Sequence, residues 1–178
     1  MLGSTPEIQG KNGTIKKRSG EMREEIKHFT ATAMIRNEHG EFLLHEHQKL
    51  GFWLPPGGHI EENEEPQHAV FREVLEETGL ECRVISCGLP FASQVHDSSH
   101  TQVLPSPIAI LKEFIADKKK GNHWHIDMIY LCELLPSSQP PFAPFEWVPF
   151  EKLTKLNIPE DVIELAKVVN EFYRLQGK

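Results

Sequence analysis

The chain has 178 residues, of which 39% are hydrophobic and 25% are charged, so it can bury one good core, and its length favours one domain over two. The net charge of −7 argues against duplex nucleic acid as a partner, because such binding relies on Lys and Arg that neutralise phosphates. No stretch approaches the roughly 18 consecutive apolar residues of a membrane helix, and the amino terminus lacks the apolar core of a signal peptide. We therefore expect a soluble, cytoplasmic protein without a membrane partner.

The domain organisation predicted from composition is a short leader followed by one folded domain. Residues 1–20 are polar, rich in Gly, Ser and Lys, and show no periodicity, so we expect a disordered leader there and the domain over 21–178. Cys82, Cys87 and Cys132 are odd in number and form no Cys-x-x-Cys pair. This supports neither a disulfide framework nor a zinc ribbon, and buried, reduced thiols are expected.

The first predicted elements are two short strands, over 28–36 and 41–47, which Asn37–Gly40 joins into a hairpin. The segment Trp53–Gly58 follows and contains two prolines and two glycines. Since proline does not suit a central strand and glycine permits backbone geometries that other residues resist, we expect a tightly specified loop there.

A helix is predicted next, over about 64–78. Pro66 suits its first turn, and Gly79 suits the position just after its last turn. The later elements are strands over 81–88, 106–115 and 124–134, a turn at 117–122, an irregular stretch at 136–144, a short edge strand at 146–148, and a final helix that starts near Pro159. Helices interspersed with a mixed sheet imply an α/β fold with layered α/β/α packing.

The predicted central helix has one apolar side and one acidic side. At about 100° per residue, Val70, Phe71, Val74 and Leu75 cover one arc, and Ala69, Glu73, Glu76 and Glu77 cover another. Like charges three or four positions apart repel each other, so the acidic arc is a poor arrangement for an unliganded surface. It becomes favourable when divalent cations bind to it.

Magnesium fits such an arc, because it takes oxygen ligands and commonly uses one or two carboxylates together with substrate phosphate oxygens. Ions held there would clamp a pyrophosphate, neutralise the charge that develops on phosphorus and on the leaving oxygen, and lower the pKa of an attacking water. The helix therefore indicates hydrolysis of a phosphate bond. A solvated acidic face is the alternative.

The acidic helix lies within a known sequence motif. Gly58–Glu64, seven further residues and then Arg72–Leu80 fit every fixed position of the Nudix box, G-x5-E-x7-R-E-U-x-E-E-x-G-U, where U is apolar. The chain therefore resembles the Nudix, or MutT-like, hydrolases. Upstream, Trp53–Gly58 is similar to the loop that leads into the box, with one proline more than the commoner form. The resemblance implies the Nudix fold, an α/β/α sandwich with a mixed central sheet.

The same resemblance implies a Mg²⁺-dependent pyrophosphohydrolase, with Mn²⁺ as a possible substitute. Its substrate would be a nucleoside diphosphate linked to a moiety X, such as a nucleoside triphosphate, a nucleotide sugar or a dinucleotide. A monomer or homodimer is expected. By position, the magnesium ligands would be Glu73, Glu76 and Glu77 with the Gly58 carbonyl, and one glutamate of this set could be the general base. Arg72 would orient the glutamates, and Glu64 would hold the box together.

Other candidate site residues are polar or aromatic. His123, His125 and Asp127 alternate, so they share a face if that stretch is a strand, as do His45 and His47. A zinc site needs three or four converging ligands, whereas these pairs show only local alignment. We therefore expect Asp127 or a neighbouring histidine to line the substrate cleft. His59 is a second cleft candidate, with plain exposure as the alternative. Phe52, Trp53 and Trp124 could stack on a nucleotide base, and packing in the hydrophobic core is the alternative.

The substrate itself is left open by the sequence. The places downstream of the box that distinguish enzymes acting on ADP-ribose or on dinucleoside polyphosphates hold His96 and Asp97 instead of the typical residues, and the polar segment Leu89–Leu104 is expected to supply specificity. Two rival functions remain. One is a catalytically silent domain that senses a nucleotide, against which the intact glutamates argue. The other is an isoprenoid diphosphate isomerase, which would be expected to carry a cysteine before the box, where none stands.

Overall fold

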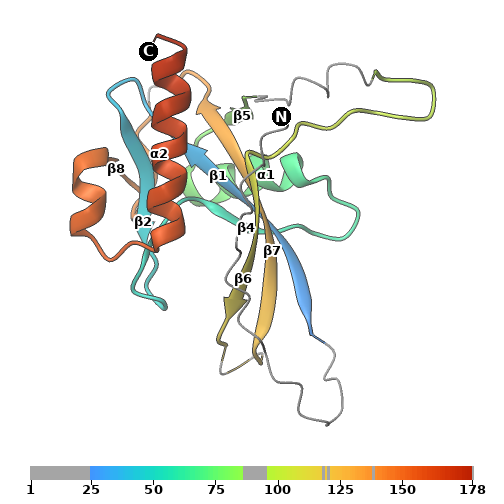
Figure 1. Cartoon of the computed structure of the whole chain (residues 1–178), viewed down its shortest axis with the longest axis horizontal. Helices are drawn as coiled ribbons and strands as arrows, with labels where there is room; N and C mark the ends of the chain where they lie inside the picture. The colour runs from blue at the N-terminus through green and yellow to red at the C-terminus, as the bar shows by residue number, and fades with distance from the viewer. Residues whose placement is uncertain (1–24, 86–95, 118, 120, 138, 178) are drawn as a thin grey trace, which may run out of the picture.

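The computed structural model describes residues 25–85, 96–117, 119, 121–137 and 139–177, and the predicted leader 1–20 lies outside them. Within this part of the chain, strands and helices intermix along the sequence (Figure 1). The elements are β1 (Lys27–Ile35), β2 (Glu41–Glu46), β3 (Trp53–Leu54), β4 (Gly57–His59), α1 (Pro66–Thr78), β5 (Cys82–Val84), β6 (Ala109–Ile115), β7 (His123–Leu134), β8 (Glu146–Pro149), the 3-10 helix η2 (Phe150–Lys155) and α2 (Glu160–Leu175).

The larger sheet is mixed. Its strand order is β4-β1-β7-β5, and β6 also pairs with β7. β1 and β7 run parallel, from Lys27 opposite Trp124 to Ile35 opposite Cys132, whereas β4, β5 and β6 pair antiparallel with their neighbours. A smaller antiparallel sheet has the order β3-β2-β8. The predicted mixed α/β fold is therefore confirmed.

The two faces of the larger sheet pack against different helices. Side chains alternate along a strand, so Ala31 and Ala33 of β1 face α1, where Val70 and Val74 are fully buried. Met34 lies in a second buried cluster on the other face. That cluster also contains Ile129 and Leu131 of β7 and Val162, Leu165, Ala166 and Val169 of α2. In Figure 1, α2 lies in front of the sheet and α1 behind it. The sheet is thus the central layer between two helices.

The prediction of a first hairpin was right about the turn and wrong about the pairing of its two strands. The chain does reverse at Asn37–Gly40, where the Gly40 N–H donates to the Asn37 carbonyl at 3.1 Å. The strands on either side share only an isolated bridge between Arg36 and Phe42. β1 belongs to the larger sheet and β2 to the smaller one. The reason is that β1 pairs along its whole length with β7, which lies far away in the sequence.

The segment predicted as a loop, Trp53–Gly58, contains two short strands instead. β3 and the start of β4 lie in it, each at the edge of a different sheet. The two prolines between these strands are consistent with this arrangement, since proline is tolerated at sheet edges. The loop prediction was wrong, but the expectation that no central strand runs here holds.

The predicted central helix is confirmed, with Pro66 in its first turn and Gly79 at its end. Gly79 adopts φ 70°, and its N–H donates to the Leu75 carbonyl at 2.9 Å. Glycine has no Cβ that opposes this left-handed conformation, so it ends the helix at low cost. The division of the helix into an apolar and an acidic arc misplaced two side chains. Leu75, on the apolar arc, is 47% exposed, whereas Ala69, on the acidic arc, is fully buried.

The remaining predictions can be checked element by element. The strands expected over 106–115, 124–134 and 146–148 correspond to β6, β7 and β8, and the final helix corresponds to α2. Cys82 and Cys132 are buried free thiols, as expected, whereas Cys87 and the end of the predicted strand 81–88 lie outside the described residues. Among the described helices, none has the length and apolar character needed to cross a membrane.

Candidate active site

The carboxylates of α1 lie against the edge strand β4. A Cβ built on Gly58 would fall 2.5 Å from Cδ and 2.8 Å from Oε2 of Glu73. The Gly57 N–H donates to Oε2 of Glu77 at 3.1 Å. Two glutamates one helical turn apart are therefore held beside two consecutive glycines, and the lack of a side chain on Gly58 makes the approach possible.

Arg72 holds these groups in place. Its guanidinium donates to both oxygens of Glu64, at 2.9 and 3.0 Å, and to Oε1 of Glu73 at 2.7 Å. The same group donates to the His59 carbonyl at 2.9 Å, while the contact with Glu76 is longer, at 3.4 Å. Bidentate pairing of this kind fixes orientation as well as charge. Arg72 thus ties the start of the helix, the edge strand and Glu73 together.

Charges in this cluster shift one another's protonation. The hydrogen bonds from Arg72 lower the pKa of Glu64, although partial burial opposes this shift, and the bonds to Glu64 raise the pKa of Arg72. Burial raises the pKa of Glu77 to about 7, helped by the nearby charges of Glu73 and Glu76 and opposed by the hydrogen bond from Gly57. A carboxylate that is costly to ionise alone is stabilised by a bound cation. The donor set therefore fits a hard divalent ion, and Glu76, the most exposed of the three, is open to it.

A second group of polar residues lies on the sheet face that α2 covers. Asp127 is 6% exposed and accepts hydrogen bonds from Thr30 at 2.9 Å and Thr32 at 2.8 Å. Burial raises the pKa of Asp127, and these two bonds oppose the shift. On the neighbouring strand, burial raises the pKa of Glu113 to about 7, and the charges of Asp127 and Asp161 add to this. The predicted alternation of His125 and Asp127 on one face agrees with this arrangement.

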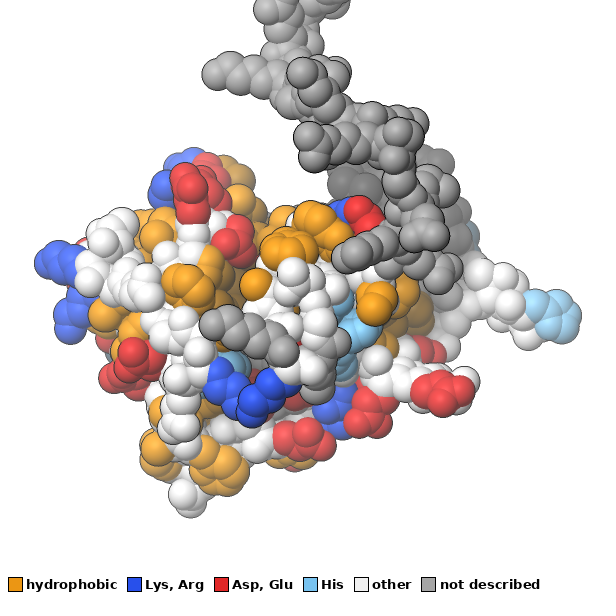
Figure 2. Space-filling model, turned by 90° about the horizontal axis from the view of Figure 1, so that it is seen from below, with side chains coloured by type: hydrophobic (Ala, Val, Ile, Leu, Met, Phe, Trp, Pro, Cys, Tyr) orange, Lys and Arg blue, Asp and Glu red, His pale blue; other side chains and the backbone are white. Residues whose placement is uncertain are grey.

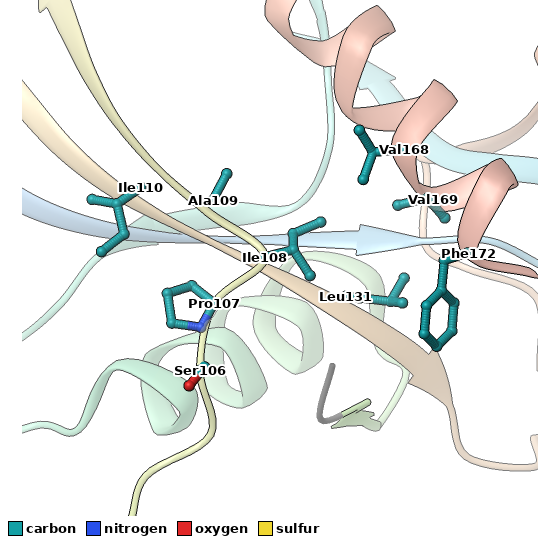
Figure 3. A pocket seen from close by; sticks show the side chains of 9 residues that line it. All are labelled: Ser106, Pro107, Ile108, Ala109, Ile110, Leu131, Val168, Val169 and Phe172. Atoms are coloured by element: carbon teal, nitrogen blue, oxygen red, sulfur yellow. The ribbon is translucent and has the colours of Figure 1, made fainter. Parts of the chain in front are cut away.

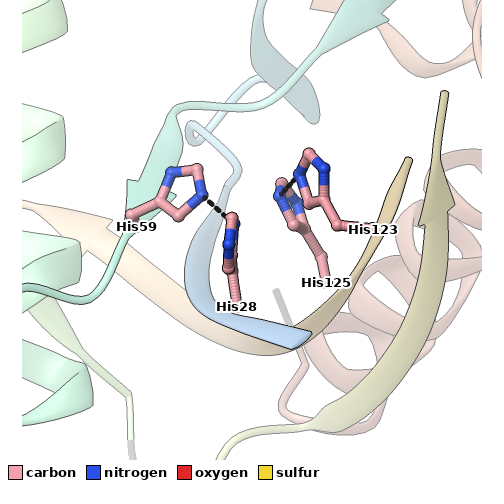
Figure 4. Close-up of side chains that lie close together, drawn as sticks. All are labelled: His28, His59, His123 and His125. Carbon is pink, nitrogen blue, oxygen red and sulfur yellow. Dashed lines mark hydrogen bonds between the residues drawn. The ribbon is translucent and has the colours of Figure 1, made fainter. Parts of the chain in front are cut away.

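Four histidines converge at one end of the same face. They are His28 on β1, His59 at the end of β4, and His123 and His125 on β7 (Figure 4). One potential ligand nitrogen from each ring lies within 4.8 Å of all the others. Figure 2 shows the molecule from the end at which β1 and β7 begin. Histidine side chains are visible on this side beside acidic and basic ones. Burial and the neighbouring histidines lower the pKa of His125 to about 4.

His28 was missed by the sequence reasoning, which considered only local pairs. His45 and His47 are neighbours, with ring centroids 5.7 Å apart, but they do not belong to the cluster of four. The three aromatic candidates lie in different surroundings. Trp53 packs against the buried core, Trp124 packs edge-on against Phe114, and Phe52 is 39% exposed.

An apolar pocket shares no lining residue with either polar group. It is lined by residues before and in β6, by Leu131 of β7, and by Val168, Val169 and Phe172 of α2 (Figure 3). Its volume is 540 Å³, and none of its lining residues is titratable. A pocket without acids, bases or cation ligands does not fit phosphate chemistry, so the carboxylates beside β4 are the better candidate.

Comparison with known proteins agrees with this geometry. The sequence profile of the NUDIX domain matches residues 26–172, which include α1, β4 and the four histidines. The chain belongs to the Nudix family. The sequence-based assignment to the Nudix hydrolases is therefore confirmed.

Proteins similar to this Nudix protein include one named as a pyrophosphohydrolase and several with solved structures. An RNA pyrophosphohydrolase from Agrobacterium fabrum is 29% identical over 135 residues, which are 71% of this chain and 74% of the relative. The crystal structure of a NUDIX-family hydrolase from Clostridium perfringens is 26% identical and has a TM-score of 0.64, covering 82% of this chain and 97% of the other. The Ap4A hydrolase of C. elegans, at 19% identity and TM-score 0.57 over 85% and 99%, shares the fold.

Proposed function

We propose that this Nudix protein hydrolyses a pyrophosphate bond in a nucleoside diphosphate linked to a moiety X, with Mg²⁺ as its cofactor. The observation that carries the proposal is the position of Glu73 and Glu77 beside the glycine pair of β4, with Arg72 bonded to Glu73. Three carboxylates on a rigid helix are the oxygen ligands that Mg²⁺ prefers, and the remaining positions suit waters and substrate phosphates.

The residues that would hold the metal are Glu73, Glu76 and Glu77, with the carbonyl of Gly58. When bound, Mg²⁺ supplies charge neutralisation on the phosphate oxygens and a water of lowered pKa, and Mn²⁺ is expected to substitute for it. Arg72 keeps the carboxylate of Glu73 turned toward β4 through its hydrogen bonds. One glutamate of the set acts as the general base that takes the proton of the attacking water.

The substrate is proposed to extend from α1 across β4 to the sheet face that carries Asp127. β4 is only three residues long, and in antiparallel pairing with β1 its His59 lies opposite Thr30, which places His59 on the Asp127 side of the strand. Asp127, His59 and His125 are the candidate contacts for the nucleoside or for X. The relatives' names, RNA pyrophosphohydrolase and Ap4A hydrolase, add a 5′-pyrophosphorylated RNA and a dinucleoside polyphosphate to the compounds to be tried.

The proposal is tested with a panel of nucleoside triphosphates, nucleotide sugars, ADP-ribose, dinucleotides, a dinucleoside polyphosphate and a 5′-pyrophosphorylated RNA, with products identified after incubation with Mg²⁺. Hydrolysis of at least one compound is expected, and Glu77→Gln is expected to lower turnover by at least about a hundredfold, because a ligand to the charge-stabilising ion is lost. Glu62→Gln is the matched control, since Glu62 is an exposed acid outside the helix.

The result decides between the enzyme and a silent nucleotide sensor. A sensor would bind a nucleotide in the panel with Mg²⁺ and release no product, and that outcome would overturn the proposal. Equal turnover of Glu77→Gln and wild type would also overturn the assignment of the helix, even if hydrolysis is observed.

A further inference from the structure

The cluster of four histidines has the spacing of a metal site. Nδ1 of His28 lies 3.2 Å from Nε2 of His59, and Nε2 of His123 lies 3.2 Å from Nε2 of His125. Zinc binds imidazole nitrogen at about 2.0–2.1 Å in tetrahedral sites, so two ligand nitrogens on one ion are about 3.3 Å apart. These two nitrogen pairs already have about that separation, and one ring nitrogen from each of the four histidines lies within 4.8 Å of the others. Small side-chain rotations would bring all four nitrogens around one ion.

The orientation of His123 also suits a ligand. Its Nδ1 lies 2.9 Å from the carbonyl oxygen of Gly121. A carbonyl accepts only, so Nδ1 carries the proton and Nε2, which points into the cluster, keeps its lone pair. Histidines that bind metals commonly donate their second ring N–H to a backbone carbonyl, which fixes the tautomer and the ring orientation. His123 is itself buried, so this orientation is set by the fold.

The four ligands come from three different strands. Parallel pairing sets His28 opposite His125, β-strand alternation places His123 on the same face as His125, and antiparallel pairing of β4 with β1 adds His59. The group that the structure brings together contains only histidines. Imidazole nitrogen suits zinc and other transition metals, whereas Mg²⁺ prefers oxygen. The cluster therefore selects a different metal from the carboxylates of α1.

We propose that His28, His59, His123 and His125 form a tetrahedral Zn²⁺ site that is separate from the magnesium site. All four positions are filled by protein, so the site is structural. The ion would pin the end of β4 to β1 and β7. Because the carbonyl of His59 accepts a hydrogen bond from Arg72, it would also steady the strand on which the α1 carboxylates rest. His59 and His125 would then act as zinc ligands rather than as substrate contacts.

The experiment measures metal content, so it does not depend on hydrolysis. The full chain is stripped with a chelator, given Zn²⁺ in the presence of excess Mg²⁺, desalted and analysed for zinc. We expect about one zinc per chain and a higher melting temperature, since a ligand that binds only the folded state stabilises it. Co²⁺ in place of Zn²⁺ is expected to give the intense visible absorption of a tetrahedral cobalt centre.

The variants locate the ion. His28→Gln and His59→Gln are expected to weaken zinc binding by at least about tenfold, and His59 is exposed, so its replacement is safe for folding. His47→Gln is the matched control, because His47 belongs to a histidine pair outside the cluster. Glu73→Gln is expected to keep its zinc, which separates this site from the carboxylates. Melting curves of the stripped variants check that each one folds.

Three results would overturn the proposal. They are wild-type protein without bound zinc, zinc retained equally by His28→Gln and His59→Gln, and cobalt bound with the weak spectrum of an octahedral ion. In each case the four histidines do not form a tetrahedral zinc site. The hydrolase proposal would stand or fall separately, on product formation.

Discussion

Replacing Gly58 by alanine is expected to disable the site by moving a single carboxylate. The new Cβ would lie 2.5 Å from Cδ of Glu73 and closer still to its Oε1, whereas ordinary contact begins at 3.4 Å, so the carboxylate has to move by at least about 0.9 Å. The backbone at Gly58 is not in the left-handed region, so alanine meets no backbone strain there. The whole effect therefore comes from the displacement of Glu73.

A shift of this size acts on both stability and turnover. The hydrogen bond of 2.7 Å between Arg72 and Glu73 would lengthen, which costs about 1 kcal/mol for a partly exposed pair and lowers the melting temperature by about 2–4 °C. A misplacement of about 1 Å in a catalytic group can cost about a hundredfold in rate, or about 2.7 kcal/mol of barrier. We therefore expect Gly58→Ala to fold and to lose about two orders of magnitude in kcat/KM.

The assay is steady-state hydrolysis of the best substrate from the panel over a range of Mg²⁺ concentrations. Gly51→Ala is the matched control, because Gly51 has φ +68° and nothing lies within 4 Å of an added Cβ. That change costs about 1–3 kcal/mol of backbone strain without touching a carboxylate. If Gly58→Ala keeps wild-type turnover and wild-type Mg²⁺ dependence, the close approach of Glu73 to β4 has no role in catalysis.

Three further changes test the surrounding structure. Arg72→Lys loses the bidentate pairing with Glu64 and is expected to destabilise the fold by about 2 kcal/mol, which urea denaturation measures; an unchanged midpoint would contradict it. Glu113→Gln is expected to stabilise the fold by about 1–2 kcal/mol at pH 8 and not at pH 4. Burial and the charge of Asp127 raise the pKa of Glu113 to about 7. Ionisation of Glu113 above that pH therefore lowers the free energy of unfolding. The expected gain of about 1–2 kcal/mol is already reduced for the partial exposure of this side chain. Equal gains at both pH values would refute this account. Val74→Ala removes a fully buried side chain and is expected to cost about 2 kcal/mol, seen as a fall of about 4–8 °C in calorimetry, with the Mg²⁺ dependence unchanged.

The parts of the site that are local in sequence could be predicted well. The helix, its ends at Pro66 and Gly79, and the gathering of glutamates on one side follow from spacings of a few residues, since helix periodicity and capping are local properties. The helix periodicity was less accurate about how deeply each side chain is buried. The prediction treated the apolar arc as uniformly buried. Val70 and Val74 are fully buried and Phe71 packs against the same core while partly exposed, but Leu75 at the edge of that arc is 47% exposed.

Pairings between distant strands could not be predicted in the same way. The parallel alignment of β1 with β7 has no local signal, so the partner of His125 was not identified as His28. The same pairing draws β1 away from β2, which is why the hairpin failed. One sign was present in the sequence, because His28, Thr30 and Thr32 alternate in an apolar strand just as His123, His125 and Asp127 do. Two strands with matching polar alternation are candidates for adjacent places on one face.

The pairing of β1 with β7 also bears on how the chain folds during its synthesis. Thr30 and Asp127, bonded across the two strands, are 97 residues apart in the sequence. The ribosome therefore releases β1 and α1 well before β7 emerges, and the apolar side of α1 has no complete sheet to cover until then. Contacts between such distant residues slow folding and leave apolar surface open to aggregation. Chaperone dependence of this protein would accordingly be greatest while β7 is still being translated.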